Sequence, residues 1–408
     1  MGNNRVCNRL AHWLRNRNIY FMKDRVVITG VGLVDTLGTY PMECFENMIS
    51  DHYEHPVDFK TDIESLKGLV CFKSRDVNYT IPDGIRKPVF GSLSTASKNA
   101  LHVVQQAMGD IDSTDVAVVF SSIAGKEGVR NTDFCNKMEG GKRLSPRTAV
   151  QYLRDFSAGV ISQTFDFRGA CVSMDAACAT GLYSIDYAIH LLDTHRFVIV
   201  GGTDNPAMDD NMFIFSQLGA LGTASKPFDK KRDGFVMGEG AGALLLEKES
   251  EARLRGANII GYINTVSHHS DGALGAPTAP DPNSTGSIAS MTSVTQNIVG
   301  DVAFVNAHGT STPMGDDLEY NAIQEVLPKV PVISFKSKIG HSLAASGINE
   351  TIYSLLCLYN GVIPKNFNID ECDHEFVYKY KHRLTSKIAV KNSFAFSGRS
   401  SSLVLEVE

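Results

Sequence analysis

The chain of 408 residues carries 39 basic and 45 acidic side chains, and 43% of its residues are hydrophobic. This composition is typical of a globular protein with a substantial core, and the net charge of −6 gives no reason to expect nucleic-acid binding. The eight cysteines form no C-x-x-C pair, which argues against a structural zinc site or a disulfide framework and favours a reducing, cytoplasmic setting. No apolar run approaches the roughly 18 residues of a membrane span.

Residues 1–22 differ from the rest of the chain, because they hold four arginines, the only tryptophan and no acidic residue. The alternatives are a targeting segment, a helix on a membrane surface, and an extension introduced ahead of Met22 by cloning or by a misassigned start. We expect an extension or tag, so that the fold begins at Lys23.

From Lys23 onward, short apolar runs alternate with segments of helical periodicity. The first run, residues 25–32, predicts a buried strand that ends in a tight turn at Gly30-Val31-Gly32, because the third glycine and the lysine of nucleotide-binding loops are missing. Residues 53–90 are polar and irregular, which indicates a surface excursion. Residues 137–146 are rich in glycine and lysine and predict a mobile or partner-facing loop.

Strands and helices are predicted along the whole remaining chain. The strands are expected at 115–120, 197–202, 243–247, 259–266, 302–306, 332–335, 388–392 and 403–407, and the helices at 94–108, 182–192, 316–327 and 344–359. This alternation predicts a layered α/β fold with mostly covered sheets. No linker rich in proline or serine divides the chain, so we expect one compact unit made of two similar halves, 23–267 and 268–408.

A cysteine lies where a strand turns abruptly into a helix. Residues 169–174 are compatible with a strand, and apolar residues recur at helical spacing after Gly181, which places Cys178 at or near a helix N-terminus. The free N–H groups and the helix dipole favour a thiolate there, and the thiolate is the nucleophilic form. Position alone leaves a buried structural cysteine equally open.

Two histidines beside glycine, His308 and His341, each follow a buried strand, and Lys336 precedes the second. Either one alone is more often structural, but neighbouring strand ends of an α/β sheet converge on one crevice. A Cys–His protease needs only one imidazole. A second imidazole fits chemistry in which another oxyanion is stabilised, such as the enolate left when a β-keto acid loses CO2.

A metal site is the other chemistry that clustered histidines suggest, with His268 and His269 as further ligands. Adjacent residues on a strand point to opposite faces, so this pair is a poor chelate. We therefore predict no metal and a structural role for both.

Four motifs mark a resemblance: D-A-A-C-A-T-G at 175–181, P-F-D-K-K-R-D-G-F-V-M-G-E-G-A-G at 227–242, N-A-H-G-T-S-T-P-M-G-D at 306–316 and K-S-K-I-G-H at 336–341. In this order and spacing they are similar to β-ketoacyl-acyl-carrier-protein synthases of the elongating, Cys-His-His type, a branch of the thiolase superfamily. The resemblance covers the chain from about Lys23 to its C-terminus. It implies a thiolase-like α/β fold of five layers, αβαβα, made of two duplicated halves, and a dimer in which the strand before Cys178 pairs across the interface.

The resemblance also implies a role for each site residue. Cys178 takes the acyl chain as a thioester, and His308 and His341 assist decarboxylation of the malonyl unit and stabilise the enolate. Lys336 and Glu350 order the site through a hydrogen-bond network.

Further implied residues surround this set. Phe396 gates the site and, with Cys178, supplies backbone N–H groups to the oxyanion hole. Thr310 and Thr312, and less strongly Thr278, hold the phosphopantetheine arm that an acyl carrier protein delivers, so no bound cofactor is expected. Docking of that acidic carrier implies the basic residues Arg86, Lys87, Lys142 and Arg143, while a docking arginine of the family is replaced around Gly219.

The family's terminal glycine-rich motif is altered here, because Ala395 and Ser397 stand where glycines are usual. Both substitutions restrict the loop that carries Phe396. They suggest a specialised synthase, the ketosynthase-α subunit of a type II polyketide or aryl-polyene pathway, as much as a fatty-acid enzyme. The alternatives are a non-elongating acyltransferase or cyclase, and a scaffold subunit like a chain-length factor. Whether the partner in the dimer is an identical chain or such a factor stays open.

Overall fold

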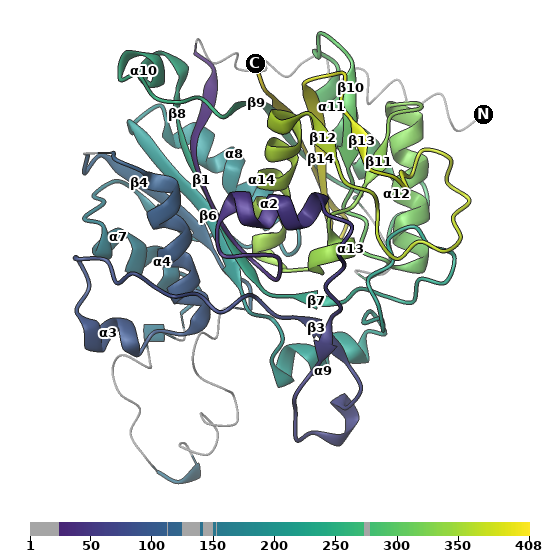
Figure 1. The fold of residues 1–408 in the computed structure, drawn as a ribbon, viewed down its shortest axis with the longest axis horizontal. Coiled ribbons are helices and arrows are strands. Elements are labelled where there is room, and N and C mark those ends of the chain that lie inside the picture. Colours follow the sequence, from purple (N-terminus) through teal and green to yellow (C-terminus); the bar gives the residue numbers. More distant parts are fainter. Residues whose placement is uncertain (1–23, 112, 125–138, 142–149, 152, 273–277) are drawn as a thin grey trace.

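The computed structural model describes residues 24–111, 113–124, 139–141, 150–151, 153–272 and 278–408 (Figure 1). Ten strands form one sheet in the order β11-β10-β14-β15-β9-β1-β8-β6-β4-β5. Their bounds are β1 Val26–Val34, β4 Val116–Ser121, β5 Cys171–Val172, β6 Phe197–Asp204, β8 Gly240–Lys248, β9 Gly261–Ser270, β10 Val302–Asn306, β11 Val332–Ile333, β14 Ile388–Ala395 and β15 Arg399–Glu406.

The sheet consists of two five-stranded halves with the same topology. In the first half β1 and β6 run antiparallel to β8, and β6, β4 and β5 are parallel. In the second half β9 and β14 run antiparallel to β15, and β14, β10 and β11 are parallel. The halves join where β1 pairs with β9, from Val26↔Ile263 to Ile28↔Gly261. The repeated order is the duplication that the resemblance implied.

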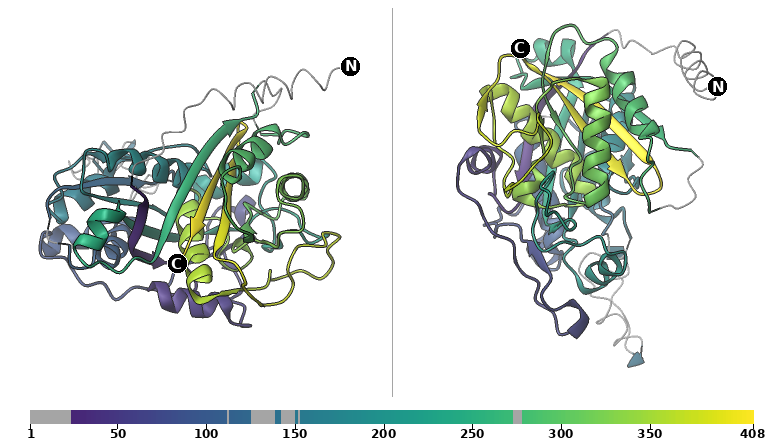
Figure 2. Two further views of the ribbon diagram at one scale, coloured as in Figure 1. Left: turned by 90° about the horizontal axis from the view of Figure 1, so that it is seen from above. Right: turned by 90° about the vertical axis from the view of Figure 1, so that its right-hand side faces the viewer.

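Helices cover and separate these two halves (Figures 1 and 2). In the first half α4 packs on β1, β8 and β6, and α7 packs on β4; in the second, α11 packs on β15 and β9 and contacts α12. Between them, α8 packs on β4 and β6, while α14 packs on β6, β8 and β14 and contacts α8. The bounds are α4 Thr95–Met108, α7 Phe156–Thr164, α8 Thr180–Leu191, α11 Thr285–Thr295, α12 Pro313–Val326 and α14 Ala344–Asn360. The layers therefore run helix, sheet, helix, sheet, helix, as predicted.

The tight turn predicted at Gly30-Val31-Gly32 is wrong, because β1 continues through these residues to Val34. A Cβ atom on Gly30 would lie 1.8 Å from the carbonyl oxygen of Ala107, and one on Gly32 would lie 1.9 Å from that of Val103. Both carbonyls belong to α4. The glycines therefore allow a helix to lie directly on the strand, a use that local turn chemistry does not reveal.

The two central helices also meet through glycines. A Cβ on Gly181 of α8 would lie 2.8 Å from the Cα of Gly347 of α14, a separation that real Cβ atoms do not reach. The start of α8 is thereby fixed against α14, and Cys178 precedes that start by two residues.

Residues 53–90 are more regular than predicted, because β3 extends a small sheet of order β2-β3-β7 and buries Cys71 and Phe72. The remaining elements are α2 Pro41–Ile49, β2 Val57–Asp58, the 3-10 turn Glu64–Leu66, β3 Val70–Phe72, α3 Lys87–Gly91, α9 Asp209–Gln217, β7 Met237–Gly238, α10 Glu249–Leu254, α13 Lys336–Ile339, β12 Val362–Ile363 and β13 His382–Arg383. Most of the loop predicted at 137–146 lies outside the described residues. The division at 267/268 stays a prediction; both residues lie within β9. Within the described ranges, no helix combines the length and the apolar character needed to cross a bilayer.

Candidate active site

The turn that carries Cys178 lies between β5 and α8. Ala177 has a φ of 50°, a left-handed conformation that costs a non-glycine residue about 1–2 kcal/mol. The Thr180 hydroxyl supports it, accepting from the Ala176 N–H at 2.8 Å and donating to the Ala177 carbonyl at 2.6 Å. Cys178 is 8% exposed at the N-terminal end of α8, the position predicted for it.

The cysteine and the two histidines meet at one point. The Sγ atom of Cys178 and ring nitrogens of His308 and His341 all lie within 4.8 Å of one another. The two imidazole rings are nearly perpendicular, in a T-shaped arrangement, with ring centroids 5.4 Å apart and an angle of 84° between the planes. In the part of the chain that the structure describes, His308 Nδ1 and both ring nitrogens of His341 lack a hydrogen-bond partner. These polar atoms are available to a bound substrate.

The internal repeat explains why distant segments converge here. Cys178 precedes α8, and His341 takes the corresponding place before α14 in the second half. Each turn contains a non-glycine residue with positive φ, Ala177 at 50° and Leu343 at 46°. His341 is fixed to the segment around β7, since its N–H donates to the Val236 carbonyl at 2.8 Å.

A buried ionic network lies behind His308. The Lys336 ammonium donates to the His308 carbonyl at 2.7 Å and to Glu350 Oε1 at 2.5 Å. Lys391 on β14 contacts the other oxygen of Glu350 at 2.9 Å. The structure thus brings the predicted Lys336 and Glu350 to the Cys-His-His set.

Two charged residues of this network were not anticipated from the sequence. Glu319 on α12 accepts hydrogen bonds from the backbone N–H groups of His308 at 2.7 Å and Gly309 at 2.8 Å, and it is 4% exposed. Lys391 is fully buried. Its signal was a lysine inside the apolar run of a predicted strand, because a charge there requires a buried partner.

Both imidazoles are held neutral. Burial, followed by the positive charge of Lys336, lowers the pKa of His341 to about 3. The same two effects lower the pKa of His308 well below its usual range. Burial raises the pKa of Glu350, but the charges of Lys336 and Lys391 outweigh it and keep this pKa below its ordinary value.

The sequence argument that the helix N-terminus favours a thiolate is not met in this state of the site. Burial raises the pKa of the Cys178 thiol to about 11, although the ammonium of Lys336 lowers it. Desolvation of a thiolate outweighs the stabilisation by dipole and ammonium, so Cys178 is a thiol at neutral pH.

A cavity of about 410 Å³ leads to these groups. Its lining includes Cys178, His308 and His341 together with the predicted residues Thr278, Thr310, Thr312 and Phe396. Part of the cavity wall is apolar and is formed by Phe215, Leu218 and Phe235. The structure therefore gathers the proposed nucleophile, imidazoles, hydroxyls and gate around one space.

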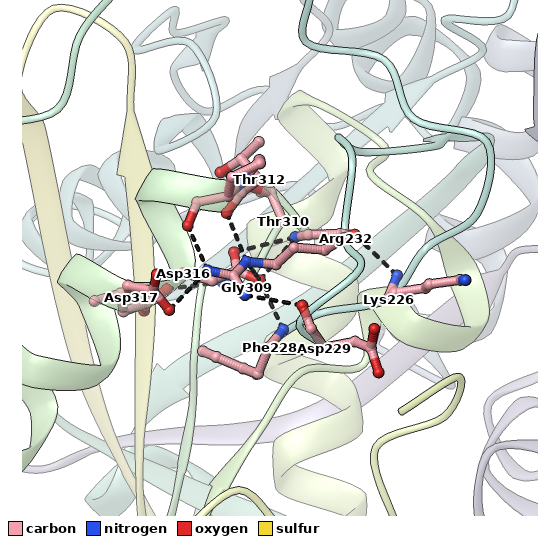
Figure 3. A network of polar contacts seen from close by, with 12 residues as sticks. Lys226, Phe228, Asp229, Arg232, Gly309, Thr310, Thr312, Asp316 and Asp317 are labelled. Carbon is pink, nitrogen blue, oxygen red and sulfur yellow. Dashed lines mark hydrogen bonds and ion pairs between the residues drawn. The ribbon is translucent and has the colours of Figure 1, made fainter. Parts of the chain in front are cut away.

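A polar network fixes the loop that carries the two threonines (Figure 3). Arg232 donates to the Thr312 carbonyl at 3.1 Å and pairs with Asp317 at 2.7 Å. Asp316 accepts from the Phe228 N–H at 2.8 Å. The charged motif at 227–242 thus ties two loops together beside the cavity.

Phe396 lies in the turn between β14 and β15, and it is partly buried. Ser397 and Gly398 follow with φ values of 65° and 67°. A Cβ on Gly398 would lie 2.9 Å from Asp271, whereas Ser397 bears a side chain in a conformation that favours glycine. The altered motif therefore places strain at the turn beside the cavity.

Of the four predicted docking residues, the two that the structure describes do not belong to the cavity wall. Arg86 and Lys87 are exposed at the start of α3 and do not line it. Lys142 and Arg143 lie outside the described residues. His268 stacks on Tyr183, and His269 bonds to Ser293, so the two adjacent imidazoles contact different neighbours.

Comparison with known proteins matches two family models to successive parts of the chain. Residues 88–252 match the family model of the β-ketoacyl synthase N-terminal domain, and residues 260–370 match that of the C-terminal domain. The 3-oxoacyl-[acyl-carrier-protein] synthase 2 of Staphylococcus aureus is 31% identical over 94% of this chain and 98% of the relative. That of Coxiella burnetii is 29% identical over 94% and 98%. The chain belongs to the β-ketoacyl synthase family and is an acyltransferase of the condensing type.

Solved structures share its fold. A β-ketoacyl synthase from Burkholderia phymatum superposes with a TM-score of 0.82 at 26% identity, covering 94% of this chain and all of that one. The ishigamide ketosynthase/chain length factor gives 0.82 at 23% identity over 95% of this chain and all of that one. The fold is thus the thiolase-like one of ketosynthases.

Proposed function

We propose that this protein lengthens an acyl chain by two carbons, first taking it onto Cys178 and then condensing it with a malonyl group carried on an acyl carrier protein. The observation that supports this most is the neutral imidazole pair within 4.8 Å of the Cys178 sulfur. Neutral imidazoles beside a nucleophile can accept its proton in one step and donate hydrogen bonds to an enolate oxygen in the next.

The loading step exchanges one thioester for another. The thiol proton of Cys178 passes to a neighbouring imidazole as Sγ attacks the acyl carbonyl, and the departing carrier thiolate takes it up. Backbone N–H groups of Cys178 and Phe396 stabilise the tetrahedral oxyanion. The products are acyl-Cys178 and a free carrier thiol.

The condensation step releases CO2. The electron pair of the breaking carbon–carbon bond forms an enolate, whose oxygen accepts hydrogen bonds from His308 and His341. The enolate carbon attacks the acyl thioester, and the electrons of the broken C–S bond return to Sγ, which takes one proton from the solvent. A β-ketoacyl group remains on the carrier. Imidazoles that stay neutral suit this role, because they donate hydrogen bonds without yielding a full proton.

Access to Cys178 fits a phosphopantetheine arm. The hydroxyls of Thr310 and Thr312 lie 3.3 Å apart at the cavity wall, and they are proposed to bind its amides, with Thr278 as a further donor. A carrier in complex with its type II polyketide ketosynthase occurs among the structural neighbours. Arg86, Lys87, Lys142 and Arg143 are proposed to attract the acidic carrier.

A second chain completes the assembly in this proposal. Among the described strands, β5 ends the sheet, and Cys171 on it is exposed, so an edge is available for pairing. Two neighbours are ketosynthases with a chain length factor. We propose a dimer with an identical chain or such a homologue, in a reducing cytoplasm, which suits the free cysteines of the described residues.

Mass analysis of the protein with acyl-carrier and malonyl-carrier substrates tests the proposal. The wild type is expected to show an acyl adduct on Cys178 and a carrier product longer by two carbons. Cys178→Gln removes loading, whereas His308→Ala keeps loading and loses condensation. Loading without extension in the wild type would instead indicate a non-elongating acyltransferase, the alternative that the strained Ser397 favours, and no loading would indicate a scaffold subunit.

A further inference from the structure

Glu350 is held by two buried ammonium groups, although one would satisfy its charge. Lys336 and Ser346 each contact Oε1 at 2.5 Å, and Lys391 contacts Oε2 at 2.9 Å. The exposed fractions of Glu350, Lys336 and Lys391 are 0%, 1% and 0%. Besides the ion pair with Lys391, Oε2 has no hydrogen-bond partner among the described residues.

Lys391 is also linked to the strand that delivers His308. It pairs in register with Asn306 at the end of β10. Its neighbour Asn392 donates to Glu319 Oε1 at 3.3 Å, and that oxygen accepts from the His308 N–H at 2.7 Å. Residues 391–392 therefore contact Glu319, which binds the His308 N–H, and Glu350, which binds the lysine that donates to the His308 carbonyl.

Four buried charged residues, two glutamates and two lysines, form an array around His308, and their charges balance only when Lys391 is present. Glu319 and Glu350 face Lys336 and Lys391, and all four are at least 96% buried. Removal of one partner from a buried array leaves an uncompensated charge, which is more costly than the pairing is favourable. A lysine in the middle of an apolar strand is thereby explained.

We propose that Lys391 is a positioning residue for the condensation step: it fixes the second oxygen of Glu350, and through Glu350 and Lys336 it holds His308 at the cavity. The inference rests on the proposed function. Lys391 touches neither the cavity nor Cys178, so loading is expected to proceed without it.

The same ammonium acts on the imidazoles through its field. The titratable groups around them are Cys178 before α8, Glu319 on α12, Lys336 on α13, Glu350 on α14 and Lys391 on β14. Burial and the charge of Lys336 are the two largest causes that lower the pKa of His308 and of His341, and the charge of Lys391 lowers both further. Its removal raises both, so the acidic limb of the condensation rate moves to higher pH.

The test compares Lys391→Met with Lys338→Met. Lys338 is a matched control: it is fully buried, and its ammonium donates to the carbonyls of Asn47 and Ser50 at the end of α2, outside the array. Loading of Cys178 and condensation are measured separately from pH 3 to 9, a range that includes the pKa of about 3 of His341, with thermal unfolding as the check on folding.

Lys391→Met is expected to load at about the wild-type rate and to condense about 100-fold more slowly, the loss that a displacement of about 1 Å of a catalytic group produces. The acidic limb of its condensation rate moves to higher pH, while Lys391→Arg has this limb at the same pH as the wild type. Lys338→Met loses stability but keeps the ratio of the two rates. Lys391→Gln replaces the methionine variant if that variant does not fold.

A Lys391 variant that condenses at the wild-type rate with an unmoved limb overturns the inference. So does a loss that Lys338→Met shares, or an arginine variant that behaves like methionine. A wild type that loads but does not condense overturns the proposed function instead, so the two failures are distinct.

Discussion

At the position of Cys178, two opposing effects act on one thiol. The N-terminus of α8 and the ammonium of Lys336 favour the thiolate, while burial opposes it and leaves the pKa at about 11. A resting thiol resists oxidation and stray alkylation, because the thiolate is the reactive form. In the proposed reaction the group becomes a nucleophile when a substrate brings its carbonyl within reach of Sγ and an imidazole takes the proton.

Alkylation of Cys178 by iodoacetamide is therefore expected to accelerate about tenfold per pH unit from pH 7 to 10, because the thiolate fraction grows in this way below the pKa. Peptide mass analysis would give the rate for Cys178, and Cys178→Ser would show that the adduct is assigned correctly. A rate that levels off below pH 9 would mean that the thiolate forms more easily than burial allows.

Individual site residues differed in how far the sequence revealed them. Cys178, His308 and His341 could be predicted because each stands beside small residues at the end of a strand or turn. Glu319 and Lys391 could not be assigned, since the first acts on backbone N–H groups and the second on a carboxylate 41 positions away, Glu350. Such pairings form only when separate elements of the second half, among them α12, α14 and β14, come together in the fold.

Single elements are positioned by close backbone contacts, and α8 is the clearest case. Gly181 leaves no space for a side chain because α14 lies directly against it at Gly347. Among the described residues, and leaving aside its chain neighbours and the backbone of its own helix, Gly159 in α7 has no atom within 4 Å of where its Cβ would be. The two glycines are thus matched in chemistry and opposite in surroundings.

Gly181→Ala is expected to lower the free energy of unfolding by about 1–3 kcal/mol, the usual cost of overpacking, and to slow loading because α8 carries Cys178 at its start. Gly159→Ala is expected to raise stability by about 0.5–1 kcal/mol, since alanine loses less backbone entropy in a helix. Denaturant midpoints and loading rates check both. Equal effects of the two substitutions would contradict the packing argument.

The same contacts show why element boundaries were predicted better than element relations. Helix 344–359 and strand 302–306 match α14 and β10 within one residue, because their apolar periodicity is local. Gly30 and Gly32 were misread as a turn, because their purpose is contact with α4. Residues 70–72 gave too short an apolar run to indicate β3, which pairs with β7 more than 160 residues later.

On the scale of the whole molecule, the two halves are joined by the β1–β9 pairing and by contacts between α14 and the first half. Asp35, just after β1, is one such contact: Tyr353 of α14 donates to its Oδ2 at 2.6 Å, and the Leu37 N–H donates to its Oδ1 at 2.8 Å. Burial raises the pKa of Asp35 from 3.8 to about 6, against the lowering effect of these hydrogen bonds. The folded protein therefore binds a proton here that the unfolded chain releases near pH 4.

This raised pKa has a definite sign for stability. The protonated Asp35 carboxyl makes its full contribution to stability below the pKa of the unfolded chain. As the pH rises from 4 through the folded pKa, about 3 kcal/mol of this contribution is lost. The amount follows because a tenfold difference in proton affinity between the folded and unfolded states is worth about 1.4 kcal/mol. Asp35→Asn cannot ionise, so its stability relative to wild type is expected to rise by about that amount between pH 4 and 7. Other carboxylates titrate equally in both proteins and cancel in the difference. Denaturant unfolding at several pH values measures it, with the exposed Asp83→Asn as control, and parallel curves for wild type and Asp35→Asn would show that the carboxylate joining the halves stays ionised.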